Sequence, residues 1–217
     1  MERKANTRKK PTRKVDSFND AKRVVRADAQ RNLEVILRTA LEVFETSGVD
    51  APVREIADKA GIGVATLYRH FPERSHLIKA VVEQGVNACA DAALKLAAAN
   101  PPGEALSLWM QRLVDLLKTK RGLAAALHTN DPAYQSLPDY YRNRLTPVLE
   151  TLLNAASAAG NIRADVDAAE LLMAATRVAT PAGEGDVAQA RRMVALLVDG
   201  LRSGDGGGTR KGTRPRS

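Results

Sequence analysis

One short segment of the chain carries four hydrogen-bonding side chains, those of Thr66, Tyr68, Arg69 and His70. A threonine hydroxyl or methyl group can contact a base edge in the major groove of DNA. The other three side chains offer donors suited to phosphate oxygens. A Tyr or His on a short helix is, taken singly, more often structural. It is their occurrence in this order that favours a nucleic-acid contact.

Small residues precede this polar group. Val64 and Ala65 allow a backbone to approach base edges closely. Gly63 lies where a helix would begin, and the N–H groups at a helix N-terminus favour a phosphate. The segment therefore has small side chains at its N-terminal end and hydrogen-bond donors at its C-terminal end.

The flanking sequence predicts two short helices that would position these side chains. Ile56 and Ala57 belong to an apolar face with three- and four-residue spacing, and Gly61 can adopt the left-handed backbone that ends a helix. Leu67 and Phe71 are one turn apart and can face a core. Two helices joined by a few residues containing glycine form a helix-turn-helix.

The segment from residue 31 to residue 82 resembles the DNA-binding domain of the TetR (tetracycline-repressor) family of transcriptional regulators. The matching residues are Ile36, Ala40, Phe44, Gly48, Ile56, Ala57, Gly61, the run from Leu67 to Phe71, and Leu77. Two positions depart from the family pattern. Ala51-Pro52-Val53 replaces the Ser or Thr that often opens the second helix, with Asp50 as an alternative cap, and Gly63 replaces a frequent Ser.

The resemblance implies an all-α protein, with an N-terminal three-helix helix-turn-helix domain followed by a larger helical ligand-binding and dimerisation domain. It also implies a homodimeric, sequence-specific regulator of double-stranded DNA, a repressor that leaves its palindromic operator when a small effector binds. The expected DNA contacts are Gly63, Val64, Ala65, Thr66, Tyr68, Arg69, His70 and Arg74, with Arg23 and Arg26 from the basic N-terminal segment.

The distribution of charge points to the same class of partner. The net charge of the 217 residues is +8, and residues 1–31 hold eleven Lys or Arg against four Asp or Glu. Residues 202–217 hold five against one, so the middle of the chain is slightly acidic. Basic ends raise affinity for a polyanion, although they are also typical of solvated tails. We expect residues 1–27 and 203–217 to be disordered arms, the first able to enter a minor groove.

Proline, glycine and hydrophobic spacing predict the remaining elements. Residues 28–74 form the expected DNA-binding domain, its first helix starting near Asp28, and residues 75–202 form the second domain. In the second domain, the helix from about residue 133 to 159 is expected to be interrupted near Pro138 and Pro147. The last two helices are candidates for a dimer interface, or else they fill the monomer's own core. Predicted ligand contacts are Trp109, Met110, Leu113, His128, Tyr134 and Tyr141. Their Ala- and Leu-rich surroundings suggest a largely apolar ligand.

Other classes of protein fit less well. The sequence shows no metal-ligand spacing and no nucleophile elbow, so we expect no enzyme, metal or cofactor. No apolar run reaches the ~18 residues of a membrane span. The single cysteine, Cys89, fits a reducing cytoplasm. Two alternatives stay open: a non-specific DNA-binding protein driven by its basic arms, and a ligand-binding protein that no longer reads DNA.

Overall fold

Glycine and proline divide this chain into helices. The computed structural model describes residues 15–127, 129, 131–179 and 186–202, and these ranges contain helices and no strand. The all-α prediction is confirmed. In chain order the elements are α1 (Val15–Ser47), α2 (Val53–Ala60), α3 (Val64–His70), α4 (Arg74–Ala99), α5 (Pro102–Gly122), α6 (Ala124–Leu127), the 3₁₀ helix η1 (Pro132–Tyr134), α7 (Leu137–Ala158), α8 (Ala168–Ala179) and α9 (Val187–Asp199).

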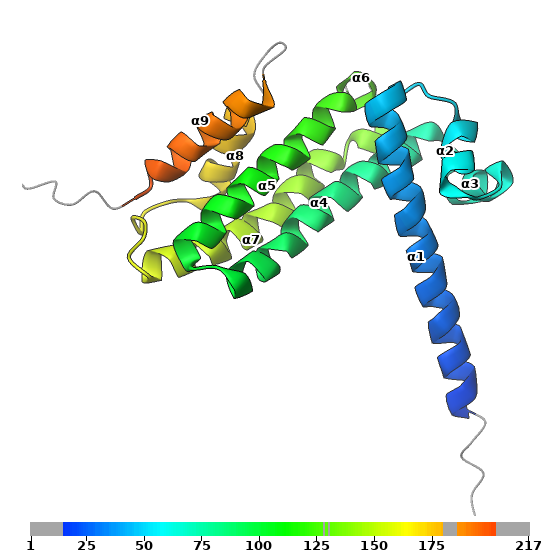
Figure 1. Ribbon diagram of the computed structural model, residues 1–217, viewed down its shortest axis with the longest axis horizontal. Coiled ribbons are helices and arrows are strands. Elements are labelled where there is room, and N and C mark those ends of the chain that lie inside the picture. The colour runs from blue at the N-terminus through cyan, green and yellow to red at the C-terminus, as the bar shows by residue number, and fades with distance from the viewer. Residues whose placement is uncertain (1–14, 128, 130, 180–185, 203–217) are drawn as a thin grey trace, which may run out of the picture.

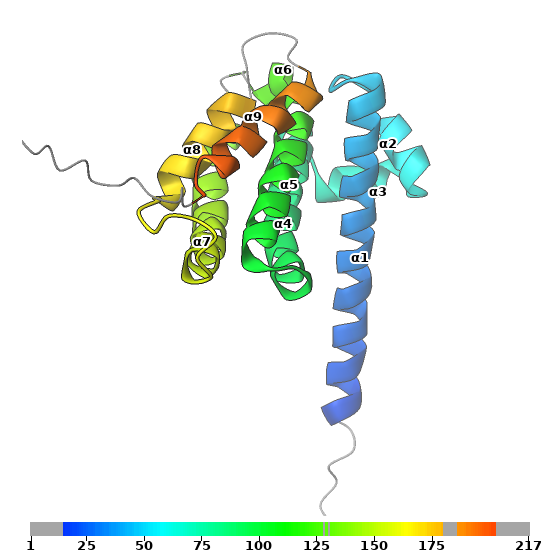
Figure 2. The same ribbon diagram turned by 60° about the vertical axis from the view of Figure 1, so that its left-hand side comes forward.

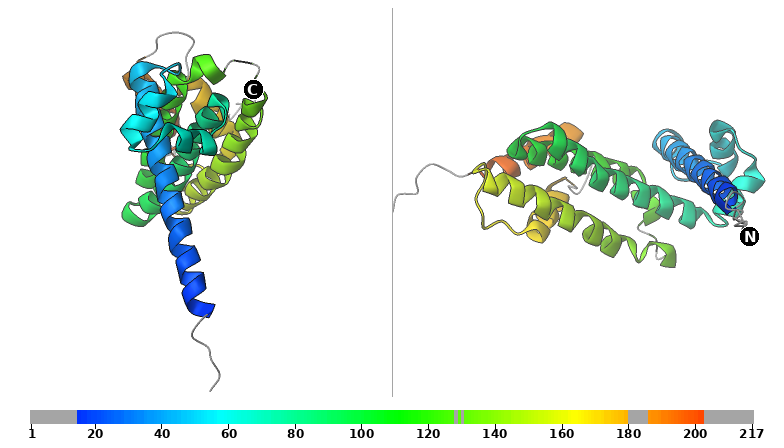
Figure 3. Two further views of the ribbon diagram at one scale, coloured as in Figure 1. Left: turned by 90° about the vertical axis from the view of Figure 1, so that its right-hand side faces the viewer. Right: turned by 90° about the horizontal axis from the view of Figure 1, so that it is seen from below.

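The helices form an elongated body with the helix-turn-helix at one end. Helices α4, α5 and α7 run side by side along the body, with α9 packed on α5 and α8 packed on α7 (Figure 1). Helices α2 and α3 lie beside the C-terminal half of α1 (Figure 2). The N-terminal half of α1 projects away from the other helices, as Figure 3 also shows.

The N-terminal core joins the first four helices. Its buried residues include Ile36 and Phe44 of α1, Ile56 of α2, Leu67 of α3 and Ile78 of α4. It also takes up three residues from later in the chain, Leu123, Tyr134 and Leu137. The segment between α5 and α7 is therefore part of the wall of the N-terminal domain.

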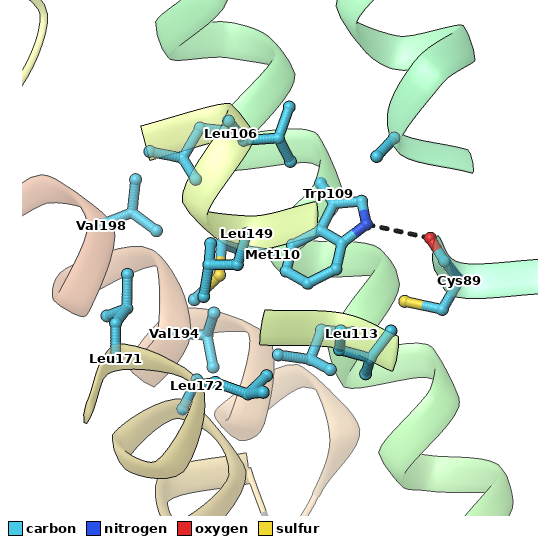
Figure 4. Close-up of a cluster of buried hydrophobic side chains, with 14 of the residues drawn as sticks. Cys89, Leu106, Trp109, Met110, Leu113, Leu149, Leu171, Leu172, Val194 and Val198 are labelled. Carbon is cyan, nitrogen blue, oxygen red and sulfur yellow. Dashed lines mark hydrogen bonds between the residues drawn. The ribbon is translucent and has the colours of Figure 1, made fainter. Parts of the chain in front are cut away.

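The C-terminal core fills the space between α4, α5, α7, α8 and α9 (Figure 4). Trp109 is fully buried at its centre, and its indole N–H donates a hydrogen bond to the carbonyl oxygen of Cys89 at 2.9 Å. On α4, Val82 belongs to the N-terminal core and Val86 to the C-terminal core. The two cores thus meet one helical turn apart inside α4, rather than after residue 74 where the sequence suggested the division.

The first helix begins earlier than the sequence suggested. α1 starts at Val15, so residues 15–27 are helical and the prediction that they belong to a disordered arm is wrong. No glycine or proline lies between Val15 and Gly48, and this stretch includes the good helix formers Ala, Arg, Lys and Gln. Asp28 lies within α1 and does not cap it.

Helix α7 passes through Pro147 without a break, which contradicts the predicted interruption there. Because proline has no N–H, it cannot donate the helix hydrogen bond to the carbonyl oxygen of Asn143. Both residues are exposed, so water can satisfy that carbonyl group. Pro138 lies in the first turn of α7, where a missing N–H costs nothing.

One smaller expectation is also corrected. Pro52, not Asp50, precedes α2, and no side chain caps that helix. The sequence left α8 and α9 open as a dimer interface or as monomer core, and their buried residues Leu172 and Val194 belong to the core.

Candidate DNA-binding surface

The helix-turn-helix forms as the glycine spacing predicts. Gly61 adopts a left-handed backbone, with φ of 68°, and its N–H closes α2 onto the carbonyl oxygens of Ala57 and Asp58. Gly63 then opens α3 in an extended conformation, and its carbonyl oxygen accepts from the N–H of Thr66 at 2.8 Å. The chain therefore reverses between α2 and α3 within three residues.

Helix α3 has one buried side and one exposed side. Leu67 is only 1% exposed in the N-terminal core, and Phe71 is half-buried at the end of the helix. Ala65, Arg69 and His70 are exposed, and the side chain of Tyr68 is 50% exposed.

The remaining predicted contacts of this helix lie at its N-terminal end. Gly63 is exposed, and Val64 and Thr66 are half-buried. The seven predicted contacts from residue 63 to residue 70 thus share one short helix and the residue that precedes it. Thr66 presents its hydroxyl next to the open start of this helix, since its Oγ1 lies 3.9 Å from the Cβ that a side chain at Gly63 would carry.

Helix α2 is fastened to the end of α1. The hydroxyl of Ser47 donates to Glu55 at 3.0 Å, and Lys59 forms an ion pair with the same carboxylate at 3.1 Å. Hydrogen bonds from Lys59 and then Ser47 hold the pKa of Glu55 below its usual value. Ser47, absent from the predicted motif, thus supports the first turn of α2, where the departure at residues 51–53 leaves no capping hydroxyl.

The side chain of Arg74 is directed toward the main chain of its own domain, although the sequence predicted that it contacts DNA. Its Nη1 donates to the carbonyl oxygens of Val49 at 2.9 Å and Ala51 at 3.0 Å, and its Nη2 donates to Ala51 as well. The guanidinium carbon also lies 6.0 Å from the centre of the Phe44 ring. These bonds tie the first turn of α4 to the loop between α1 and α2.

Arg23 and Arg26 lie on the projecting half of α1. The prediction that they belong to a disordered arm is wrong, because α1 begins at Val15. Their contact with DNA stays a prediction, now from a helix.

Comparison with known proteins identifies the architecture. The family model of bacterial regulatory proteins of the tetR family matches residues 36–81. The model for the C-terminal domain of SbtR-like transcriptional regulators matches residues 101–203. The TetR transcriptional regulator SCO0520 from Streptomyces coelicolor, known from a crystal structure, is 35% identical in sequence to this chain. The match covers 78% of this chain and 98% of the SCO0520 chain, with a TM-score of 0.61. This chain belongs to the TetR family of transcriptional regulators.

Other relatives agree with this assignment. A TetR transcription regulatory protein from Mycobacterium vanbaalenii is 36% identical, covers 82% of this chain and 99% of that chain, and has a TM-score of 0.62. An HTH-type transcriptional regulator of Staphylococcus aureus is 37% identical over 65 residues. That match spans 29% of this chain and only 34% of the relative's own length.

The TetR-family chain does not gather its predicted ligand residues at one site. Trp109, Met110 and Leu113 are fully buried within the C-terminal core, so their contact with a ligand stays a prediction that requires this core to open. Local spacing correctly placed them on an inward stripe, but it could not show that α4, α7 and α9 fill the space in front of them.

The two tyrosines lie in different places. Tyr141 packs on the C-terminal core, its hydroxyl lies 2.8 Å from that of Thr176, and burial raises its pKa to about 12. Tyr134 lies in the N-terminal core instead, and it borders a cavity. His128 lies outside the described residues.

In the part of this TetR-family chain that the structure describes, no helix combines the length and apolarity that a membrane span needs.

Proposed function

We propose that this TetR-family regulator acts in the cytoplasm as a homodimer that binds a specific operator and represses transcription until a small, largely apolar ligand releases it. The observation that carries the proposal is the two-sided nature of α3. Leu67 holds the helix in the core, while Tyr68, Arg69 and His70 are exposed on its surface.

Each end of α3 has its own role in this proposal. The small residues Gly63 and Ala65, with the neighbouring Val64 and Thr66, allow the start of the helix to approach base edges in the major groove. Tyr68, Arg69 and His70 then reach the flanking phosphates. Arg74 is left out of the DNA-contact set, because its guanidinium is engaged by main-chain carbonyl oxygens.

Exposed apolar side chains on the last two helices support dimerisation. Met173 of α8 is 49% exposed, and Met193 and Leu196 of α9 are 43% and 66% exposed. A two-fold pairing of these helices would cover the three side chains and present two copies of α3 to one palindromic site. Half-sites on one face of DNA require about 34–36 Å between the two reading helices.

Helix α4 offers the route by which ligand binding reaches the DNA reader. It contributes to both cores, and its Arg74 side chain hydrogen-bonds to the loop that leads into α2. An apolar ligand entering the C-terminal core must displace packed side chains such as Trp109 and Met110, and this would shift α4. A coupling of about 1.4 kcal/mol is enough to change operator affinity tenfold.

Arg23 and Arg26, on the N-terminal half of α1, are candidate phosphate contacts that would add sequence-independent affinity. A protein that relied on such contacts alone would be the non-specific DNA-binding alternative, with steep salt dependence and little sequence preference.

The experiment that tests the proposal is selection of bound fragments from a genomic library, followed by footprinting of the best fragment. A protected palindrome with both half-sites on one face of the helix is the expected result. Uniform retention of all fragments, lost when residues 1–27 are deleted, would contradict the proposal and favour the non-specific alternative.

A further inference from the structure

A cavity of about 480 Å³ lies at the junction of the two domains. Its walls come from the loop after α1, the first turns of α4, and four residues near α6 and η1, namely Ala126, Thr129, Asp131 and Tyr134. Small-molecule sites typically measure about 300–1,000 Å³. The lining includes Asp50, Arg74, Ser75, Ile78, Asp131 and Tyr134.

Two hydroxyl groups in the lining form no hydrogen bond with any residue that the structure describes. Ser75 and Tyr134 are each only 8% exposed, and neither side-chain hydroxyl hydrogen-bonds to any residue that the structure describes. No side-chain oxygen or nitrogen of the described residues is fully enclosed without a partner, so each of these hydroxyls keeps some accessible surface, and both residues line the cavity. A ligand in the cavity can therefore use them as hydrogen-bond partners.

The charge of the lining selects the class of ligand. Asp50, Glu73 and Asp131 contribute three carboxylates, and none of them forms an ion pair with a described residue. One oxygen of Asp131 accepts from the N–H of Ala133 at 2.9 Å, which leaves the other available. Arg74 is the only cation among the lining residues that the structure describes.

An anion is the competing occupant, because α4 begins at this cavity and Glu73 provides no side-chain cap for its first N–H groups. The guanidinium of Arg74, however, is directed onto the carbonyl oxygens of Val49 and Ala51. The remaining polar groups of the lining are therefore mainly carboxylates and hydroxyls. The oxygens of both groups accept hydrogen bonds from a protonated amine.

We propose that this cavity binds a small organic amine in its protonated form. Asp131 and the hydroxyl oxygens of Ser75 and Tyr134 accept hydrogen bonds from the ammonium group, and the alkyl part packs against Ile78 and Ala126. This site is separate from the C-terminal core, where Trp109 and its neighbours lie.

An amine held here would contact two parts of the protein that flank the helix-turn-helix and the body. The loop after α1 leads directly into α2, and the opposite wall belongs to the segment that precedes α7. Binding would therefore bias the position of the helix-turn-helix relative to the body. This regulatory consequence rests on the proposed function, whereas the binding itself does not.

Isothermal titration of the full-length protein without DNA tests the binding. Diaminobutane, butanediol and succinate share a four-carbon chain and differ in charge. We expect diaminobutane to bind once per chain and the other two to give no signal at the same concentration. Stronger binding of succinate would assign the cavity to anions, and equal binding of butanediol would show that charge does not matter. Either result, or no binding of diaminobutane, would overturn the proposal.

Matched variants locate the bound amine. Tyr134→Phe and Asp131→Asn should each weaken binding about tenfold or more, and the amide of Asn can still cap η1. Tyr140→Phe and Asp139→Asn remove the same groups from α7, away from the lining, and should bind the amine as the wild type does. Unchanged binding in the first pair would place the amine elsewhere and refute the assignment. Operator titration with and without the amine is a separate measurement. Absence of DNA binding there would count against the proposed function and not against the amine site.

Discussion

Both terminal nitrogens of Arg74 donate hydrogen bonds to the main-chain carbonyl oxygen of Ala51. This contact crosses from the first turn of α4 to the loop that precedes α2. An arginine at the start of α4 could be taken from the sequence as a phosphate contact, but its donors are directed to the protein's own backbone. The contact makes α4 and the entry to the helix-turn-helix move together.

Replacing Arg74 should therefore change the stability of the fold more than it changes the electrostatic attraction to DNA. We expect Arg74→Lys, which keeps the charge but loses the planar set of donors, to lower the free energy of unfolding by about 1–3 kcal/mol. The dependence of DNA affinity on salt should stay as in the wild type. Chemical denaturation and a salt titration measure the two effects. An unchanged unfolding free energy, with a salt slope reduced by about 1, would instead restore the phosphate-contact prediction.

The exposed donors of α3 should behave in the opposite way. Arg69→Ala should weaken DNA binding and reduce the salt slope by about 1, with little effect on unfolding, because Arg69 is exposed. Lys95→Ala removes the same charge from the exposed far end of α4 and serves as the control. Fluorescence anisotropy with labelled operator measures both variants. Equal losses in the two would mean that only net charge matters.

The two glycines of the turn should respond differently to serine. The Cβ of Gly63→Ser would meet nothing closer than the hydroxyl oxygen of Thr66 at 3.9 Å, and the new hydroxyl can cap α3. We expect it to raise the unfolding free energy by a few tenths of a kcal/mol. Gly61→Ser should lower that energy by about 1–2 kcal/mol, because φ is 68° there. Thermal unfolding of both variants provides the check, and equal shifts would show that the turn does not require the left-handed backbone at Gly61.

A charge on the outer face of α9 should separate the dimer. Leu196 is 66% exposed in the monomer, so Leu196→Asp should leave the monomer folded while it disfavours an apolar interface. Leu94→Asp, at a side chain that is 78% exposed on α4, is the matched control and should remain dimeric. Sedimentation velocity reports the assembly state. A dimeric Leu196→Asp variant would place the interface away from this face.

Alkaline pH should destabilise the C-terminal core through its buried thiol. Burial raises the pKa of Cys89 from 9.0 to about 12, so the folded protein keeps a proton that the unfolded chain loses near pH 9. The resulting stabilisation is fully present below pH 9 and is lost as pH rises toward 12. Urea unfolding above and below pH 9 should show a decline in unfolding free energy. Cys89→Ala should reduce the steepness of that decline by about 1.4 kcal/mol per pH unit. Equal steepness in both proteins would contradict this origin.

The sequence predicted the DNA-reading elements because their signals are local. Gly61 marks the turn by its own backbone preference, and the spacing of Leu67 and Phe71 fixes the buried face of α3 within one helical turn. The start of α1 was harder to place. A polar, basic stretch without glycine or proline is compatible with both a solvated tail and a helix, and only the continuity of α1 from Val15 decides it.

The rest of the candidate sites depends on contacts between distant segments. Trp109 has the same local pattern whether it lines a pocket or fills a core, and the packing of α4, α7 and α9 decides which. Arg74 is 23 residues from Ala51 in the chain, so spacing does not predict their contact. The cavity beside Ser75 and Tyr134 likewise brings together segments that are far apart in the sequence.

The most direct test of the account is a paired titration of the purified protein with its selected operator and with a shuffled duplex of equal length, at one fixed salt concentration. Reading of base edges by α3 predicts an affinity ratio of about 10³ or more, and two chains bound per operator. Equal affinity for the two duplexes would show that the basic charge alone binds DNA, and it would contradict the proposed function.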